Sequence, residues 1–461
     1  MKGKETLTKE KIKCINKVID KWLGYQKIIK RIPGMSVGII HKDNIIFSKG
    51  YGYENIKTKK PTTDETLYRI ASNSKMFTAI SIMQLVESEK LRLDDPIVKY
   101  LSWLKKDDGM TIRQLLTHSS GINRDGETSH WIDDNFPNIK EIKEHVSKGA
   151  MTYNPIEKFK YSNLGYSLLG NIIEEVAGKS YDQYVKENII EKLNLKDTYP
   201  DINEEAENKL ATGYGRDIPG VEREIFTNPS TNAMVSATGF ISNVLDLCKF
   251  MSSQFLENDS LLKSQTKKEM QRIQWVEDKG DYSINWGLGY NIWKVEKSKI
   301  IGHGGGFAGF TTGVGFDKEK EIGVALLTNA SGSNAFELLG GIFHIINSVS
   351  NQYDSPDQEE SKINLEKYEG RFHERGGDLE IVEINKELFL FYPENLAPFK
   401  ELYKLKHKEG DTFIIETGDS FDYIGEEATF NFDKSGKVNR LKVGPNTFIT
   451  FEEFYQGKKA P

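Results

Sequence analysis

The segment Met76–Val86 is apolar over almost its whole length, and it constrains the fold of this chain more than any other feature. A helix with apolar side chains on every side is stable only where other elements cover it all round. The chain must therefore build a body thick enough to surround one helix. Its 461 residues, with a hydrophobic content of 38%, are sufficient for such a body and indicate two or three domains.

Ser72-Asn73-Ser74-Lys75 stands directly before this segment. A serine and a lysine three residues apart lie on one helix face, so the amine can reach the hydroxyl and act as the base that a serine nucleophile needs. Burial of the helix also favours the neutral amine that a general base requires. The same spacing occurs in polar or lysine-rich surroundings, which indicate solvated surfaces, at Ser102/Lys105, Ser260/Lys263 and Ser264/Lys267.

Strand-like runs near both ends of the first 350 residues predict one antiparallel sheet, with a mostly helical lobe between them from Ser72 to about Ile273. A basic amphipathic helix near the start and a helix over Ala335–Asn347 would cover one face of this sheet. We therefore predict an α+β fold in which Ser72 lies between the two lobes, where ligand clefts tend to form. The predicted strands are Met35–His41, Ile45–Tyr51, Ile300–Gly302, Phe310–Phe316 and Ile322–Thr328.

The C-terminal part differs from the rest of the chain in composition and in the length of its apolar runs. Residues 351–362 are polar and contain a proline, which indicates a linker between a first domain, 1–350, and a second, 363–461. Short strand-like runs divided by Gly, Asn and Asp then predict a small all-β barrel. These runs are Leu379–Ile384, Leu388–Tyr392, Thr412–Glu416, Ala428–Phe432, Arg440–Val443 and Thr447–Phe451.

Charge and composition exclude several classes of function. The net charge of −6 argues against a nucleic-acid partner. The lysine-rich stretch 2–31 predicts a helix that either packs on the body of the protein or touches a membrane surface. Cys14, Cys248 and the eight histidines show no spacing typical of a disulfide framework or a metal site, so we expect no metal and no cofactor. No run has the length of a signal peptide or a transmembrane helix, so we expect a cytoplasmic protein without integral membrane association, or a secreted or surface protein if a leader has been removed.

Two further motifs are candidates for chemistry. Tyr161-Ser162-Asn163 precedes a predicted helix, so its phenol and amide can point into a cleft, although such a motif alone more often reflects ordinary packing. The run from His303 to Gly309 formally matches a dinucleotide-binding pattern, which requires a helix directly after it. A strand-like sequence follows instead. The run therefore predicts an edge strand bare of side chains, along which an extended substrate can lie.

In this order, the three motifs resemble those of the serine β-lactamase-like hydrolases, which include class C β-lactamases, D,D-carboxypeptidases, D-aminopeptidases and carboxylesterases. The Ser-x-x-Lys, Tyr-x-Asn and Lys/His-x-Gly motifs of that family are matched by Ser72/Lys75, Tyr161/Asn163 and His303/Gly305. The likeness runs from about Pro33 to Asn347. It includes the flanking stretches Pro33–Val37, Leu93–Pro96, Leu115–Gly121 and Ser236–Gly239.

The resemblance implies a β-lactamase/transpeptidase-like fold and an acyl-enzyme mechanism. Ser72 would attack a carbonyl group, and Lys75 and Tyr161 would transfer the protons. The backbone N–H groups of Ser72 and Gly306 would form an oxyanion hole. Substrate binding would involve Asn163, His303, Gly305 and Gly306. The segment that begins with Tyr368-Glu369-Gly370-Arg371-Phe372 resembles the lipocalin-like domain of some peptidases in the family, where it shapes the cleft or the oligomer.

His303 departs from the lysine of the lactamases, because histidine can be neutral at pH 7. This form resembles the peptidases and esterases of the family. We therefore predict a serine hydrolase that cleaves amide bonds, in particular in a peptide containing a D-residue (D-aminopeptidase or D,D-peptidase-like). Its partners would be a small peptide, amide or ester substrate, and a homo-oligomer is compatible with the resemblance. A carboxylesterase of the same fold and a slowly acylating penicillin-binding or sensor protein stay open. His118 is a further candidate base, although turn histidines mostly satisfy local hydrogen bonds.

Overall fold

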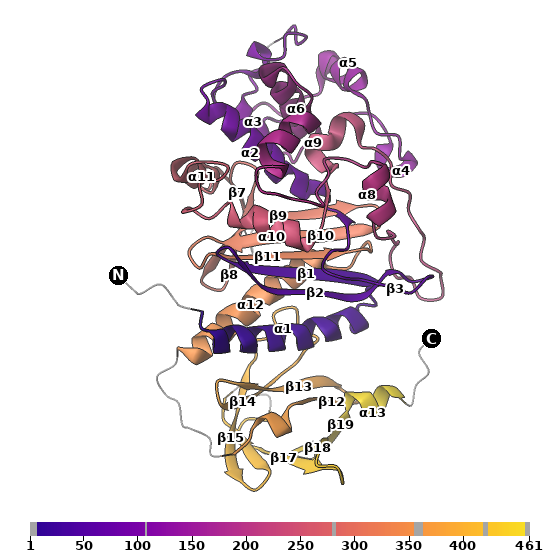
Figure 1. Ribbon diagram of the computed structural model, residues 1–461, viewed down its shortest axis with the longest axis vertical. Coiled ribbons are helices and arrows are strands. Elements are labelled where there is room, and N and C mark those ends of the chain that lie inside the picture. Colours follow the sequence, from indigo (N-terminus) through magenta and orange to yellow (C-terminus); the bar gives the residue numbers. More distant parts are fainter. Residues whose placement is uncertain (1–6, 107, 279–282, 355–362, 418–422, 457–461) are drawn as a thin grey trace. The chain divides into compact units, whose positions relative to one another are not determined.

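The computed structural model describes residues 7–106, 108–278, 283–354, 363–417 and 423–456 (Figure 1). The chain divides into two compact units, Arg31–Leu339 and Met1–Lys30 together with Gly340–Pro461. The predicted linker, 351–362, begins inside helix α12 (Ala335–Tyr353), and its residues 355–362 lie outside the described part. The predicted boundaries of the domains therefore stay a prediction.

The unit Arg31–Leu339 contains an antiparallel sheet of nine strands in the order β3-β2-β1-β11-β10-β9-β8-β7-β6. Strands from both ends of the unit meet where β1 pairs with β11, with Met35 opposite Thr328. The predicted single sheet is therefore confirmed. The strands are β1 (Gly34–His41), β2 (Asn44–Asn55), β3 (Lys60–Pro61), β6 (Trp275–Asp278), β7 (Ser283–Trp286), β8 (Asn291–Val295), β9 (Ser298–Phe307), β10 (Phe310–Asp317) and β11 (Ile322–Thr328).

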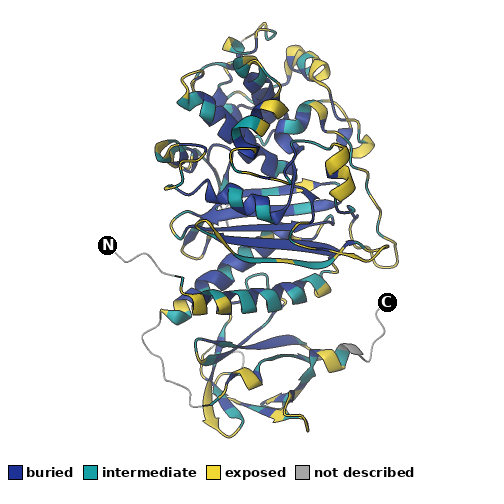
Figure 2. Cartoon of the chain, in the orientation of Figure 1, coloured by how far each residue is buried: buried dark blue, intermediate teal, exposed yellow. Residues whose placement is uncertain are grey.

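The central strands are buried along almost their whole length, as the dark blue ribbons of Figure 2 show. Helix α10 (Val244–Ser252) lies directly against β1 and β11. Glycine makes this approach possible, because a Cβ on Gly38 would lie 2.9 Å from Cys248 Sγ, and one on Gly323 would lie 2.9 Å from Met251 Sδ. The glycines of these two strands therefore set how closely the helix can pack on the sheet.

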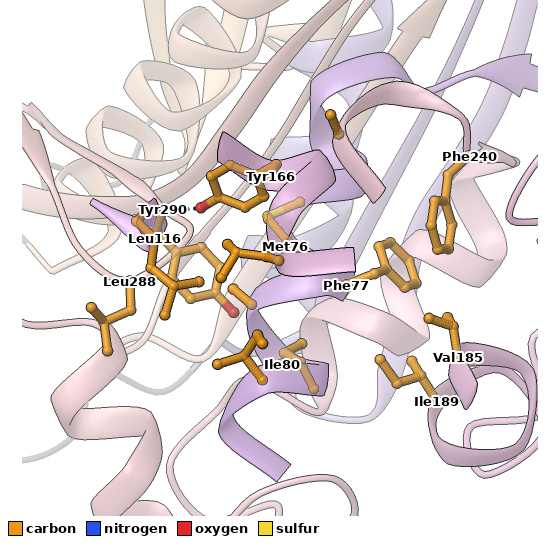
Figure 3. Close-up of a cluster of buried hydrophobic side chains, with 14 of the residues drawn as sticks. Met76, Phe77, Ile80, Leu116, Tyr166, Val185, Ile189, Phe240, Leu288 and Tyr290 are labelled. Carbon is orange, nitrogen blue, oxygen red and sulfur yellow. Dashed lines mark hydrogen bonds between the residues drawn. The ribbon is translucent and has the colours of Figure 1, made fainter. Parts of the chain in front are cut away.

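Helix α2 (Ser74–Glu87) is covered on all sides, as its sequence predicts. Its side chains Met76, Phe77 and Ile80 pack among residues from several other elements (Figure 3). The Phe77 ring stacks on Phe240 and Phe250 at centroid distances of 4.5 and 4.1 Å. The surrounding elements include α3 (Ile112–Leu116), α6 (Asn163–Ala177), α7 (Tyr181–Val185), the π-helical segment η3 (Lys186–Ile190) and α9 (Val235–Thr238).

Further short elements complete this unit, and most of the regular elements in its middle are helices, although loops join them over more than half of its residues. These short elements are β4 (Tyr68–Arg69), β5 (Ile241–Ser242), η2 (Ile97–Lys99), α4 (His130–Asp133), α5 (Ile139–Gly149), α8 (Glu204–Lys209), η4 (Asn232–Met234) and α11 (Ser264–Met270). Among the described residues of the chain, no helix is long and apolar enough to cross a membrane.

The other unit contains a closed barrel, which confirms the predicted all-β domain. Apolar side chains, with the aromatic rings of Tyr368, Phe413 and Phe430 among them, fill its interior. The expected strand ending at Phe451 is one residue too long, because Phe451 begins a helix. The elements are η5 (Glu366–Tyr368), β12 (Gly370–Glu374), β13 (Gly377–Ile384), β14 (Glu387–Phe391), β15 (Tyr403–Glu409), β16 (Thr412–Ile415), β17 (Glu427–Phe432), β18 (Val438–Val443), β19 (Asn446–Thr450) and α13 (Phe451–Gln456).

Helix α1 (Lys9–Ile29) belongs to the same unit as the barrel and contacts it through charged side chains. Lys17 Nζ lies 2.6 Å from Glu369 Oε1, and Lys21 Nζ lies 3.1 Å from Glu380 Oε1. Tyr25 Oη donates to Asp378 Oδ2 at 2.7 Å. Part of the positive charge that suggested a membrane surface is therefore neutralised by carboxylates of the barrel.

Candidate active site

Ser72 lies in the short 3₁₀ turn η1 (Ala71–Asn73), and helix α2 begins two residues after it. Ala71 adopts a left-handed conformation with φ of 50°, which costs a non-glycine residue roughly 1–3 kcal/mol. Hydrogen bonds hold the turn in this form: Asn73 Nδ2 donates to Ile70 O at 2.8 Å and to Thr312 Oγ1, on β10, at 2.9 Å. The turn that carries Ser72 is thus fixed to the sheet.

Lys75 is fully buried, and three acceptors surround its amine. Lys75 Nζ lies 3.2 Å from Ser72 Oγ, 2.7 Å from Asn163 Oδ1 and 2.8 Å from the Ala237 carbonyl oxygen. Burial lowers the pKa of Lys75 well below its usual range. The amide and carbonyl oxygens can only accept, so a neutral amine gives its two hydrogens to them and turns its lone pair toward the Ser72 hydroxyl. This geometry suits a general base.

Lys105 and Lys263 are exposed as predicted, but the solvated surface predicted at Lys267 is wrong, so burial alone does not distinguish Lys75. Lys267, three residues after Ser264, is also fully buried. Its amine donates to the backbone carbonyl oxygens of Phe255 and Asn258, so it stabilises the loop that contains these two residues. The contact with a serine hydroxyl is what sets Lys75 apart.

Tyr161 and His118 lie beside this pair. Burial raises the pKa of the Tyr161 phenol above its ordinary value, and the nearby Ser72 hydroxyl only partly offsets this effect. The ring of His118 stacks on Tyr161 at 4.2 Å. His118 has a φ of 58°, and its Nδ1 accepts a hydrogen bond from the Ser162 backbone N–H at 3.1 Å. Burial lowers the His118 pKa well below 6.5, so these contacts favour the structural interpretation of this histidine.

Asn163 connects Lys75 to a carboxylate that the sequence motifs do not indicate. It is the first residue of α6, behind the N-cap Ser162. Its Oδ1 accepts from Lys75, and its Nδ2 donates to Asp125 Oδ1 at 2.6 Å. Asp125 is a single acid in a loop after Gly121, with no characteristic spacing, so only the fold reveals its place.

Strand β9 runs past the end of its neighbour β8 and leaves one edge beside Ser72. The pairing of β8 with β9 ends at Asn291 and Gly302, whereas the pairing of β9 with β10 continues to Phe307. A Cβ on Gly305 would lie 2.4 Å from Ile70 O and 2.3 Å from Thr312 Oγ1, so no side chain fits there. A Cβ on Gly306 would meet nothing within 4 Å. The edge strand predicted from the glycine run is therefore present.

His303 lies at the start of this edge and is 4% exposed. Its Nδ1 is 2.6 Å from the Gly304 carbonyl oxygen, which can only accept, so Nδ1 carries the hydrogen. Burial, reinforced by the charge of Lys75, lowers the His303 pKa to about 3. The ring is therefore neutral at pH 7. Trp286 on β7 lies edge-on to it at 5.6 Å; the sequence reasoning missed this residue because β7 is short and irregular in pattern.

All seven predicted site residues thus gather around the Ser72 turn. In the described part of the chain, no group of three or more His, Cys, Asp or Glu side chains could hold a metal ion. Residues 19–343 match the family model for Beta-lactamase. The chain belongs to the Beta-lactamase family. The mixed α/β fold with a C-terminal closed barrel of eight strands agrees with the predicted fold class.

Comparison with relatives places this Beta-lactamase family member among hydrolases and penicillin-binding-protein homologues. The octameric penicillin-binding protein homologue from Pyrococcus abyssi is 27% identical, with a TM-score of 0.64, and the alignment covers 94% of this chain and 99% of that one. The D-amino acid amidase from Ochrobactrum anthropi SV3, complexed with L-phenylalanine amide, is 25% identical, with a TM-score of 0.64 and coverages of 74% and 99%. Protein flp of Staphylococcus aureus (strain MW2) is 25% identical over 340 residues, 70% of this chain and 66% of that protein.

Proposed function

We propose that the protein is a serine hydrolase that works through an acyl-enzyme, with Ser72 as its nucleophile. The observation that carries this proposal is the buried Lys75 amine, which lies between two obligate acceptors and the Ser72 hydroxyl. Ser72 Oγ attacks the substrate carbonyl carbon while its proton passes to Lys75. The new C–O bond gives a tetrahedral intermediate whose oxyanion lies near the backbone N–H groups of Ser72 and Gly306.

Tyr161 acts next as the acid. Its raised pKa keeps the phenol protonated, so it can give its proton to the leaving nitrogen or oxygen as the bond to the acyl carbon breaks. The proton held by Lys75 then restores the phenol. Water attacks the acyl-enzyme by the same route in reverse, and the acid product leaves with Ser72 regenerated. Asn163, His303 and Gly305 bind and align the substrate.

The proposed substrates are amides, in particular peptides or amino acid amides that contain a D-residue. The likeness to a D-amino acid amidase supports this class. A neutral His303 also lacks the fixed positive charge that would suit the carboxylate of a β-lactam. The test compares hydrolysis of D-alanyl p-nitroanilide, its L-enantiomer and a p-nitrophenyl ester. Faster cleavage of the D-anilide supports the proposal, and cleavage of the ester alone supports a carboxylesterase of the same fold.

A second candidate is a slowly acylating penicillin-binding or sensor protein, which the likeness to a penicillin-binding protein homologue favours. The two candidates differ in the lifetime of the acyl-enzyme. Mass spectrometry of the protein after incubation with a fluorescent penicillin distinguishes them. An adduct that persists over hours indicates a sensor, whereas an enzyme returns to its free mass.

Ser72→Ala tests the nucleophile directly, because loss of the nucleophile in a comparable serine hydrolase costs around a millionfold in turnover. We expect labelling by a fluorophosphonate probe to disappear while the thermal midpoint of unfolding stays close to that of the wild type. Ser264→Ala is the matched control, since it has the same spacing to a buried lysine without a contact between the two. Labelling that survives in Ser72→Ala, or disappears in Ser264→Ala, contradicts the assignment.

We also propose that the protein forms a homo-oligomer. The support is the octameric penicillin-binding protein homologue, whose structure aligns with 94% of this chain. Light scattering coupled to size-exclusion chromatography measures the mass directly. A mass of 52.5 kDa, that of one chain, at micromolar concentration contradicts this proposal.

A further inference from the structure

We propose that Asp125 is a positioning residue, which fixes the Asn163 side-chain amide so that the lone pair of Lys75 points at Ser72. This inference rests on the proposed function. Asp125 does not touch the reacting atoms: its positioning effect would pass through Asn163, and its charge would act on the Lys75 amine without contact.

The chemistry of the two ends of the amide carries the inference. Asn163 Nδ2 donates to Asp125 Oδ1 at 2.6 Å, and Asn163 Oδ1 accepts from Lys75 Nζ at 2.7 Å. An ionised carboxylate can only accept, so it holds the NH₂ end of the amide on its own side and leaves the oxygen to face Lys75. A flipped amide would turn its NH₂ group toward the amine. That group would then bind the lone pair of a neutral Lys75 and withdraw it from the Ser72 hydroxyl.

The loop that holds Asp125 is itself fixed at the start of α6. The backbone N–H groups of Asn163 and Leu164 donate to the Arg124 carbonyl oxygen at 2.8 and 3.0 Å. Arg124 Nε lies 3.0 Å from Asp125 Oδ2, which occupies the second oxygen of the carboxylate. Asn123 Oδ1 accepts from the Gly126 N–H at 3.1 Å. Asp125 is therefore held from two sides in the orientation that bonds Asn163.

Two opposite charges act on the Lys75 amine from this loop. The Asp125 carboxylate raises the Lys75 pKa and Arg124 lowers it, while burial has the largest effect and lowers it. Other titratable side chains near the amine include the rings of His118, His303, Tyr161 and Tyr166. Low pKa values of the two histidines and high pKa values of the two phenols leave all four uncharged at neutral pH. The direction in which removal of Asp125 or of Arg124 moves the Lys75 pKa can therefore be predicted.

Asp125→Asn is the first test, read as the second-order rate constant for fluorophosphonate labelling of Ser72 across pH. We expect a loss of about 100-fold, the cost typical of misplacing a reacting group by 1 Å. The acid limb of the pH profile should also move to lower pH, because the charge that stabilised the Lys75 ammonium has gone. Arg124→Gln should move that limb to higher pH. Glu127→Gln is the matched control: it removes a carboxylate from the same loop, 73% exposed, that does not contact Asn163.

A double-mutant cycle tests whether Asp125 acts through Asn163. In an Asn163→Ala background, Asp125→Asn should cause no further loss of labelling rate. The comparison within the Asn163→Ala background still tests the inference if Asp125→Asn alone is poorly folded. The inference is overturned if Asp125→Asn lowers the labelling rate equally in the wild-type and Asn163→Ala backgrounds. It is also overturned if Asp125→Asn lowers the labelling rate and the thermal midpoint of unfolding while the acid limb of the pH profile does not move, because that result would show a structural role. Failure of the proposed function would appear separately, as wild-type protein that is not labelled at Ser72.

Discussion

The glycine run of β9 provides a graded test of how closely this strand must approach the nucleophile turn. A Cβ on Gly305 would lie 2.4 Å from the Ile70 carbonyl oxygen and 2.3 Å from Thr312 Oγ1. Ordinary van der Waals contacts of a Cβ begin at 3.4 Å, so Gly305→Ala requires the strand or the turn to move by about 1 Å. Overpacking of this kind costs about 1–3 kcal/mol of the free energy of unfolding.

The same displacement should impair acylation, because a shift of 1 Å at the reacting groups costs about 100-fold in rate. Gly304→Ala is milder, since its Cβ would lie 3.1 Å from a ring carbon of Phe336. Gly306→Ala would meet nothing within 4 Å, and its free energy of unfolding should stay within about 0.5 kcal/mol of the wild type. The expected order of destabilisation is therefore Gly305→Ala, then Gly304→Ala, then Gly306→Ala.

Urea unfolding followed by tryptophan fluorescence measures the free energies, and fluorophosphonate labelling of Ser72 measures the rate of acylation. Gly306→Ala keeps its backbone N–H, so it also separates the loss of space from the loss of an oxyanion donor. Equal stability of Gly305→Ala and Gly306→Ala would refute the argument that close approach requires glycine at position 305. Wild-type labelling by a stable Gly305→Ala would refute the link between this approach and acylation.

Two other predictions follow from buried charges. The rate of Ser72 labelling should rise with pH through a midpoint below 10.5, because burial lowers the pKa of Lys75 and the neutral amine is the reactive form. The raised pKa of Tyr161 should prevent a fall in this rate near pH 10. A midpoint at or above 10.5 in a stopped-flow pH profile would contradict this prediction. Arg69→Met should lower the free energy of unfolding by about 3–5 kcal/mol in urea titrations, because Arg69 is fully buried and its loss leaves Asp201, 3.2 Å away, without this partner. The control Arg92→Met, at an exposed position, should change this free energy by less than about 0.5 kcal/mol. Similar values for the two variants would exclude the ion pair as the cause.

The sequence predicts the parts of this protein that depend on strong local patterns. The apolar run from Met76 identifies a helix covered on all sides, and the strand-like runs from Met35, Phe310 and Ile322 identify β1, β10 and β11. Strands β6, β7 and β8 were missed because they are four or five residues long and mix charged, polar and aromatic side chains. Their strand character comes from pairing with β9 and not from their own composition.

The candidate site shows the same division between local and non-local information. Ser72 and Lys75 are recognisable because one helical turn joins them and a helix that is apolar all round follows directly. Asp125 and Trp286 could not be found in this way, since a single acid and a ring in a short strand have no spacing to recognise. Ala237 lies in the stretch Ser236–Gly239, which resembles the family, and the hydrogen bond from Lys75 to its carbonyl oxygen gives a physical reason for that stretch.

The partners of helix α1 have a consequence for the synthesis of the chain. Its hydrogen bonds with Asp354, Glu369 and Asn395 join residues that are 343 to 373 positions apart. At about 5–20 residues per second, a ribosome needs roughly 20–70 s to make that interval. The whole unit Arg31–Leu339 emerges during this time and can fold first. Until then helix α1 lacks the hydrogen bond from Trp22 Nε1 to the Asn395 carbonyl oxygen, so we expect a chaperone to bind the nascent chain at this helix.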